Sequence, residues 1–236
     1  TDPQWLDEEH YLLTWNSRRQ KVNVVTGAMM PTDDALPSRR VLDTFQKFLV
    51  EQQAAASEPE RTDLPEIKVQ EDQLIYAPDR LAVLLQHADD LYCLSAGSDQ
   101  VRRLTRDGTR KQLIHFSPDK SWVSFVNADH NLCVVSVESG EPRILTTDGS
   151  PNVLNGLLDW VYQEELYGRG NYKGYWWNPQ STQIAFLQLD QTAVPRFIVV
   201  DQLPLNNGME TLPYPKAGDP NATVRVGVVN MDGEQQ

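Results

Sequence analysis

The sequence lacks the long hydrophobic segments that membrane-spanning helices need. No stretch of its 236 residues approaches the roughly 18 consecutive apolar residues of such a helix. The first residues, Thr1 to Trp5, carry neither a basic region nor an apolar core, and no initiator methionine precedes them. We therefore expect a chain without a signal peptide, or one from which a leader has been removed.

Cysteine is scarce. The two cysteines, Cys93 and Cys133, each lie inside an apolar run and do not form a metal-type pair. Buried thiols are the preferred interpretation, while a disulfide or a reactive nucleophile remain open alternatives. The cysteines therefore do not reveal the redox compartment.

Basic residues are outnumbered by acidic ones, 21 to 33, which gives a formal net charge of −12. Such a charge repels nucleic acid and anionic lipid, and it attracts cations or amine-bearing ligands. The acidic residues are scattered, so most of them are read as a solvated surface. We expect no nucleic-acid partner, no metal and no cofactor.

Most of the chain reads as short strands separated by polar turns, beginning with residues 12–15 and 21–25. The exception is a set of apolar residues at the spacing of one helix face: Val41, Leu42, Phe45, Phe48 and Leu49. They predict an amphipathic helix over about residues 38–53, with its apolar stripe packed in the core. The small, polar residues that follow are expected to end the helix and enter a loop.

The chain contains an internal repeat with a period near 40 residues. One copy covers residues 76–108, a second covers 116–149, and a third begins at residue 177. Each full copy has a Pro-Asp turn, two apolar strands, a Leu-Thr pair and an Asp-Gly pair, and Pro78 and Pro118 are 40 residues apart. Several short strands in such a period are typical of a β-propeller blade.

The predicted fold class is therefore all-β: an incomplete β-propeller of about four blades, with one amphipathic helix and one short helical insertion. Four interrupted blades are poor candidates for closure. We expect an open arc whose last blade, near residues 224–231, is exposed, and a natural protein that is longer than this chain. Open ends also predict a homo-oligomer, because unpaired strand edges bind partners.

The segment over about residues 159–170 does not fit the blade spacing. Its Gln-Glu-Glu-Leu centre, its aromatic residues and its closing glycines, Gly168 and Gly170, predict a short helical insertion. On one helical turn, Glu164 and Glu165 could converge on a single ammonium group. From these two residues alone, a solvated helix face is the favoured alternative. A glycosidase pair is disfavoured, because it needs carboxylates about 5–9.5 Å apart on opposite sides of a bond.

Residues 159–166, Asp-Trp-Val-Tyr-Gln-Glu-Glu-Leu, resemble the Glu-Glu motif segment of the dipeptidyl peptidase IV family of serine exopeptidases. The likeness continues through residues 175–179, 184–186 and 214–224, and it is specific over about residues 116–230. The predicted helix near residues 38–53 also resembles one in bacterial members, which points to a bacterial protein. The likeness implies that residues 1–236 form the N-terminal part of the family's propeller domain. It also implies that Glu164 and Glu165 bind the free N-terminal amine of a substrate.

The residues beside Glu164 and Glu165 are expected to support the site without binding the substrate amine. We expect Asp159, Trp160 and Tyr162 to support the helix, with the two aromatic rings fixing it by packing. Gln163 stands where some relatives carry a third glutamate outside the binding pair, and it is set aside. The family's arginine that holds the substrate backbone has no match, since the hairpin around residues 86–90 contains none.

The family's enzymes release N-terminal dipeptides, with Pro or Ala as the second residue, through a Ser-Asp-His triad in an α/β-hydrolase domain. Their serine sits in a Gly-x-Ser-x-Gly elbow, which this sequence does not contain. Its four histidines fall in predicted strands or hairpins: His10, His87, His115 and His130. We expect no catalytic residue in this chain, an inactive chain by itself, and a hydrolase domain beyond residue 236.

Two functions follow. The first is the substrate-gating part of a serine exopeptidase that releases Xaa-Pro or Xaa-Ala dipeptides, in which the clamped α-ammonium sets the distance to the nucleophile. Its partners would be a peptide with a free N-terminus and the missing blades and hydrolase domain of the same protein. The alternative is a non-catalytic recognition or scaffold propeller. The resemblance implies a periplasmic, secreted or membrane-tethered location.

Overall fold

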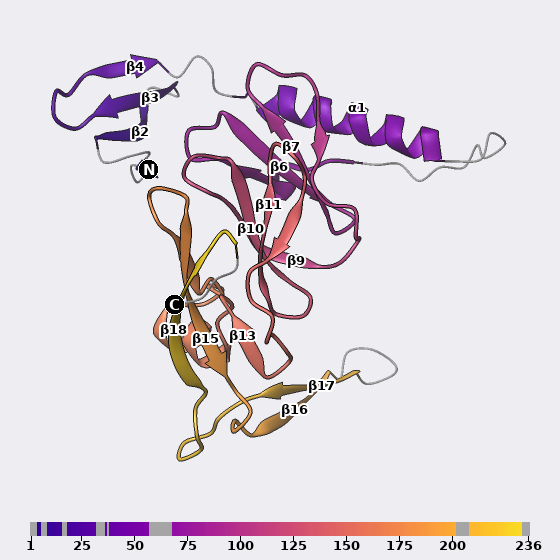
Figure 1. Ribbon diagram of the computed structural model, residues 1–236, viewed down its shortest axis with the longest axis vertical. Coiled ribbons are helices and arrows are strands. Elements are labelled where there is room, and N and C mark those ends of the chain that lie inside the picture. The colour runs from indigo at the N-terminus through magenta and orange to yellow at the C-terminus, as the bar shows by residue number, and fades with distance from the viewer. Residues whose placement is uncertain are drawn as a thin grey trace. The chain divides into compact units, whose positions relative to one another are not determined.

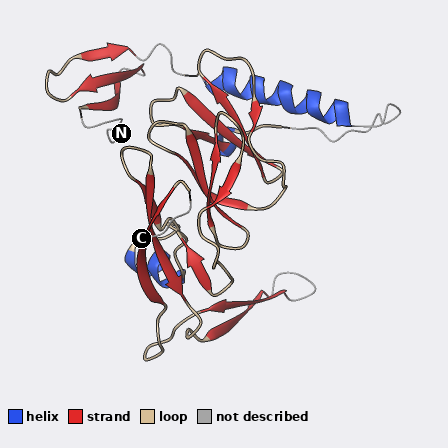
Figure 2. Ribbon diagram, viewed as in Figure 1, coloured by secondary structure: helices blue, strands red, loops and turns tan. Residues whose placement is uncertain are grey.

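The computed structural model describes residues 4–5, 9–15, 18–31, 36, 38–56, 68–201 and 208–232. Strands dominate these residues, as Figure 2 shows, and the paired strands are antiparallel. The predicted all-β class is confirmed. Within the described residues no sheet closes on itself, so the blade count and the propeller remain predictions. The chain divides into two compact units, Thr1–Gly108 and Thr109–Gln236.

The first unit contains two four-stranded sheets, ordered β1-β2-β3-β4 and β5-β6-β7-β8. The strands are β1 Gln4–Trp5, β2 His10–Trp15, β3 Arg18–Asn23, β4 Met29–Pro31, β5 Leu74–Tyr76, β6 Ala82–His87, β7 Asp90–Ser95 and β8 Arg102–Arg103. A single 3₁₀ turn, Glu71–Gln73, precedes β5. Helix α1, Ser38–Ala56, lies along the second sheet (Figure 1). The core between them consists of Leu36, Val41, Phe45, Leu49, Leu74, Val83, Leu85, Tyr92 and Leu94.

Helix α1 extends a little further than its apolar stripe indicates. Its buried residues Val41, Phe45 and Leu49 lie on one face, at the spacing that the sequence shows. The helix continues to Ala56, whereas the sequence places its end near residue 53. Residues 54–56 are alanines, which have the highest helix propensity and so prolong the helix; Ala54 and Ala55 are exposed.

The predicted strand over residues 21–25 is displaced. Strand β3 ends at Asn23, and Val24 and Val25 are exposed in the following turn. The Asn23 side-chain oxygen accepts hydrogen bonds from the backbone N–H groups of Val25 and Thr26, at 3.0 and 2.9 Å. This Asx turn satisfies the backbone locally and overrides the β-propensity of the two valines.

The second unit contains two four-stranded sheets and a separate hairpin. The first sheet has the order β12-β11-β10-β9, and in the second β15 pairs with β13, β14 and β18. The strands are β9 Lys111–Phe116, β10 Trp122–Asn127, β11 Leu132–Ser136, β12 Pro142–Ile144, β13 Val153–Asn155, β14 Tyr175–Trp177, β15 Gln183–Asp190, β16 Arg196–Asp201, β17 Gly208–Pro213 and β18 Thr223–Asn230. Figure 1 shows the β16–β17 hairpin projecting from the second sheet.

The sequence repeat recurs as the same turn in three places. Each turn is closed by a backbone N–H to C=O hydrogen bond of 2.9 Å, joining Ala77 to Ala82, Ser117 to Trp122, and Asn178 to Gln183. In each, one residue adopts a positive φ: Arg80 (60°), Lys120 (64°) and Ser181 (59°). The repeat predicted from three sequence segments is therefore a repeat of backbone geometry.

In each copy of the repeat, the threonine of the Leu-Thr pair and the glycine of the Asp-Gly pair donate hydrogen bonds to one buried side chain. In the first copy, Asp90 accepts hydrogen bonds from the Thr105 hydroxyl (3.0 Å) and the Gly108 N–H (3.3 Å). Asp90 also forms a 2.6 Å ion pair with Arg103. The second copy repeats the network without the charge, at 3.1 and 2.8 Å, through Asn131, Thr146 and Gly149. The motif therefore ties the end of each copy to its central hairpin.

The substitution Asp90→Asn is expected to destabilise the chain by about 1–2 kcal/mol near pH 7, because it keeps the acceptor oxygen but removes the charged partner of Arg103. Burial alone would raise the pKa of Asp90, but the hydrogen bonds from Arg103, Thr105 and Gly108 outweigh it and hold the pKa below its usual 3.8. The carboxylate therefore stabilises the fold above that value, and this contribution is lost as the pH falls through the lower, folded pKa.

Urea unfolding at a series of pH values measures this effect. The difference in free energy of unfolding between the wild type and Asp90→Asn should become smaller as the pH falls from about 5 to 2. Asp129→Asn, in the exposed turn of the second copy, is the matched control. Its free energy of unfolding should differ little from the wild-type value at every pH. A loss of stability in Asp90→Asn that does not change with pH would contradict the stabilising role of the ionised Asp90 carboxylate.

Candidate functional site

Residues 156–174 leave the edge of a sheet and return to the same edge. Strands β13 and β14 both pair with β15, one after the other along its length. Between them, Leu187 of β15 accepts a hydrogen bond from the Gly156 N–H (2.9 Å) and donates one to the Gly174 carbonyl (2.8 Å). The Gly174 N–H in turn donates to the Gly156 carbonyl (2.9 Å). The excursion is therefore closed at its base.

The base has no room for larger residues. Gly156 has φ +71°, and a Cβ there would lie 3.1 Å from the Tyr175 ring. A Cβ on Gly174 would lie 3.0 Å from the Leu158 side chain. Tyr175 is fully buried, its hydroxyl donates to the Leu113 carbonyl, and it accepts a hydrogen bond from the Ser124 hydroxyl (3.1 Å). These contacts hold both ends of the excursion on the sheet.

A short helix begins the excursion. The Asp159 carboxylate accepts a hydrogen bond from the Tyr162 N–H (3.0 Å) at its start, as N-capping residues do. Burial raises the pKa of Asp159, and this hydrogen bond lowers it only in part. The Tyr167 N–H donates to the Tyr162 carbonyl at 2.8 Å, which makes residues 162–166 a wider π-type turn. Gly168 follows with φ +88°.

The two aromatic residues of the helix contact different neighbours. Tyr162 packs on the cluster of Leu154, Leu158 and Leu189 and stacks on Tyr167, with ring centroids 5.8 Å apart. The Trp160 ring lies 4.4 Å, centroid to centroid, from Tyr214, in the segment that follows the β16–β17 hairpin. The helix is thus packed on both the sheet and the base of the hairpin.

The two adjacent glutamates are not equivalent. Glu164 is 27% exposed, and its Oε1 accepts a hydrogen bond from the Gln163 side-chain amide at 3.0 Å. Its Oε2 lies 3.2 Å from Nε of Arg169. Glu165 is exposed and lines a cavity of about 550 Å³ beside Trp160 and Tyr214. Among the described residues, Glu165 has no hydrogen-bond or ion-pair partner.

Gln163 is a site residue that the sequence does not reveal. It is 3% exposed, and while its amide nitrogen donates to Glu164, its oxygen accepts a hydrogen bond from the Gly170 N–H at 3.2 Å. It thereby joins the helix to the turn that follows it. From the sequence, Gln163 is set aside because it stands outside the binding pair, and a glutamine beside two glutamates carries no signal of burial.

The cysteines and histidines all lie outside residues 156–174. Cys93 and Cys133 are both buried and form no disulfide, which confirms the preferred interpretation. Burial raises the pKa of Cys93 to about 11, so the residue is a protonated thiol at neutral pH. His115 packs edge-on against Tyr175, and burial lowers its pKa. The other histidines also lie where the sequence predicts, His10 in β2, His87 in β6 and His130 in the β10–β11 turn.

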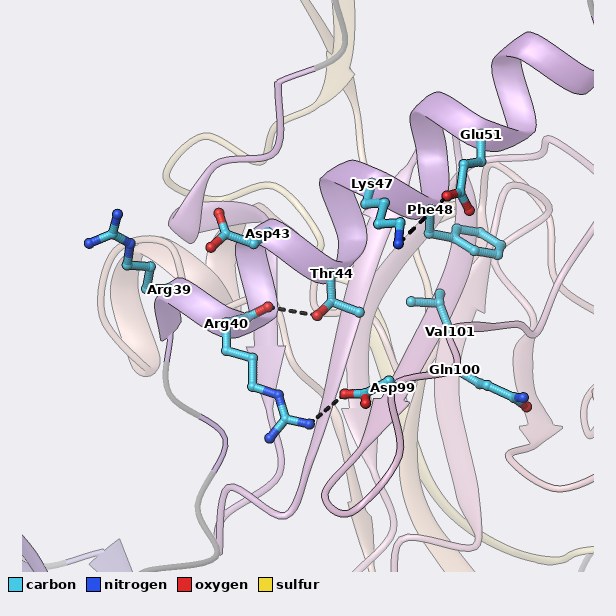
Figure 3. Close-up of a pocket in the computed structure, with 10 residues that line it drawn as sticks. All are labelled: Arg39, Arg40, Asp43, Thr44, Lys47, Phe48, Glu51, Asp99, Gln100 and Val101. Carbon is cyan, nitrogen blue, oxygen red and sulfur yellow. Dashed lines mark hydrogen bonds and ion pairs between the residues drawn. The ribbon is translucent and has the colours of Figure 1, made fainter.

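A larger cavity, of about 930 Å³, lies beside α1 in the first unit (Figure 3). Four of its charged side chains form ion pairs, Arg40 with Asp99 and Lys47 with Glu51. Within the described residues, no three His, Cys, Asp or Glu side chains gather as they would around a metal ion. In the same residues, no helix is long and apolar enough to cross a membrane.

Comparison with known proteins gives relatives along much of the chain. Dipeptidyl aminopeptidase B of Saccharomyces cerevisiae is 34% identical over 129 residues, which are 52% of this chain and 15% of the relative. A probable dipeptidyl-aminopeptidase B of Arthroderma gypseum is 36% identical over 139 residues, with 53% and 15% covered. The chain thus spans about 15% of the length of these relatives. Both are fungal, so they do not support the expected bacterial origin.

Solved structures are similar over nearly the whole chain. The crystal structure of Porphyromonas gingivalis dipeptidyl peptidase 4 matches with a TM-score of 0.62 and 23% identity, over 99% of this chain and 31% of that one. A putative dipeptidyl aminopeptidase IV from Bacteroides ovatus matches with a TM-score of 0.54 and 17% identity, over 99% and 29%. Residues 78–236 match the family described as "Dipeptidyl peptidase IV (DPP IV) N-terminal region". The chain therefore belongs to the dipeptidyl peptidase IV N-terminal region family.

Proposed function

We propose that this chain is the substrate-gating part of a serine exopeptidase that releases Xaa-Pro or Xaa-Ala dipeptides, and that Glu164 and Glu165 bind the free α-amine of the substrate. The observation that supports this most is the base of the excursion, where both chain ends are hydrogen-bonded to Leu187 of β15. A clamp on such a base holds the amine at a fixed distance from the nucleophile, so that only the second peptide bond is cut.

The electrostatics of the pair suit an ammonium ligand. Two neighbouring carboxylates repel one another, and a cation bound to both removes that repulsion. An α-ammonium has three N–H donors, enough to serve both glutamates through charge-assisted hydrogen bonds. An acylated N-terminus has no charge and a single N–H. The site should therefore reject blocked peptides.

We propose the wider setting on the same basis. The recurring turn and the antiparallel sheets support an incomplete propeller of about four blades. The partners would be a peptide with a free N-terminus, the missing blades and hydrolase domain of the same protein, and a second copy of the chain. A periplasmic, secreted or membrane-tethered location rests on the family resemblance.

The test compares two substrates of the full-length protein, alanyl-prolyl p-nitroanilide and its N-acetyl derivative. We expect kcat/KM to be at least about 100-fold lower for the acetylated substrate, because it loses the charged hydrogen bonds to both glutamates. Equal values would refute the amine clamp. Binding of the free peptide without any hydrolysis would support the recognition module instead.

A further inference from the structure

A cation of the protein itself already contacts one member of the glutamate pair. Nε of Arg169 lies 3.2 Å from Oε2 of Glu164. The Arg169 side chain is 89% exposed, and within the described part of the chain it forms no other ion pair or hydrogen bond. A single Nε contact lacks the two parallel hydrogen bonds that make arginine–carboxylate pairs strong. Exposed pairs of this kind are weak and readily exchanged.

The position of Arg169 is built into the turn. Gly168 and Gly170 flank it with φ of +88° and +82°, a conformation that favours glycine and folds the chain back toward the helix. The buried Gln163 fixes both sides of the contact, since it donates to Glu164 and accepts from the Gly170 N–H. Arg169 is thus held near Glu164 by its backbone and not by its own side-chain packing.

We propose that Arg169 is an internal competitor for the substrate amine: its guanidinium occupies Glu164 in the free protein, and the incoming α-ammonium displaces it. This inference rests on the proposed function of the glutamate pair. Glu165, which has no partner among the described residues, receives the amine first, and Glu164 follows when Arg169 leaves. Binding is therefore an exchange of one cation for another.

The exchange has a consequence for selectivity. While Arg169 neutralises Glu164, the pair presents one net negative charge, which matches one ammonium group. A divalent metal ion would have to displace the guanidinium and lose its water to gain the same two carboxylates. The competitor therefore lowers the affinity for cations that must bind both glutamates, and a cation that binds Glu165 alone leaves Arg169 in place.

The test measures the inhibition constant of alanyl-pyrrolidide, an unreactive ligand with a free amine, on the full-length protein. Arg169→Gln removes the charge and should tighten inhibition about two- to five-fold, the size expected for an exposed ion pair. The matched control Arg169→Lys keeps the charge and should stay near the wild-type value. In a Glu164→Gln background, Arg169→Gln should have no further effect, because the contact no longer carries charge.

The outcomes separate the two hypotheses. Weaker inhibition in Arg169→Gln would overturn the proposal and make Arg169 a substrate-binding residue. An unchanged inhibition constant would also overturn it. In both cases, loss of binding in Glu164→Gln and Glu165→Gln would leave the amine clamp intact. If those two variants bind as the wild type does, the proposed function itself fails.

Discussion

Replacing Glu164 and Glu165 together with glutamine is expected to lower kcat/KM of the full-length protein on alanyl-prolyl p-nitroanilide by roughly 10²–10⁴-fold. A hydrogen bond to a charged group contributes about 1.5–3 kcal/mol, and two are weakened at once. Glutamine preserves the length and shape of both side chains, so the excursion should keep its contacts. Steady-state kinetics measure the loss.

The diagnostic result is a change in selectivity as well as in rate. The double variant should no longer distinguish the free from the N-acetylated substrate, because it has lost the charges that recognise the ammonium. The matched control is Glu138→Gln with Glu141→Gln, which makes the same change in net charge in the exposed β11–β12 turn. A double variant that still prefers the free amine would rule out the glutamate clamp.

Gly149→Ala is expected to be the most damaging small substitution in the second unit, at about 3 kcal/mol or more. A Cβ on Gly149 would lie 2.4 Å from the Asp129 carbonyl oxygen and 2.6 Å from Oδ1 of Asn131. The first is a backbone atom, and the second belongs to a buried side chain held by hydrogen bonds from Thr146 and Gly149, so the β10–β11 hairpin must shift. The shift also breaks the 2.8 Å hydrogen bond from the Gly149 N–H to Asn131.

The repeat supplies a matched control at the equivalent glycine of the first copy. Gly108 has φ +57°, and a Cβ there meets no atom within 4 Å. Gly108→Ala should therefore cost only the strain of a left-handed conformation, about 1–2 kcal/mol. Urea unfolding of both variants, followed by tryptophan fluorescence, gives the comparison. A larger loss for Gly108→Ala than for Gly149→Ala would contradict this account.

The repeat and the helix were predictable because they depend on local order along the chain. The Pro-Asp turns at residues 78 and 118 recur with the same hydrogen bonds, and the spacing of Val41, Phe45 and Leu49 fixes one face of α1. The prediction of a strand at Val24 and Val25 was wrong because a single side chain determines the backbone there. There the side chain of Asn23 decides the backbone, and its turn competes with propensities that favour a strand.

The candidate site was predictable in composition but not in arrangement. The family resemblance selects Glu164 and Glu165 as a pair of equals. The structure distinguishes them, because only Glu164 accepts a hydrogen bond from the buried Gln163 and forms an ion pair with Arg169, which lies in a glycine-flanked turn. These contacts depend on a π-type turn, whose extra residue per turn changes which side chains face one another. Sequence spacing assumes an ordinary helical turn and so misses this arrangement.

The closed base of the excursion bears on how such a site changes over evolution. Since residues 156 and 174 bond to each other and to the same residue of β15, the length between them is independent of strand register. Insertions and deletions within the loop would leave the sheet pairing intact. Residues 156–174 therefore form an exchangeable module. A sheet that keeps the two glycines and the buried tyrosine could carry a different loop at this place, and with it a different binding specificity.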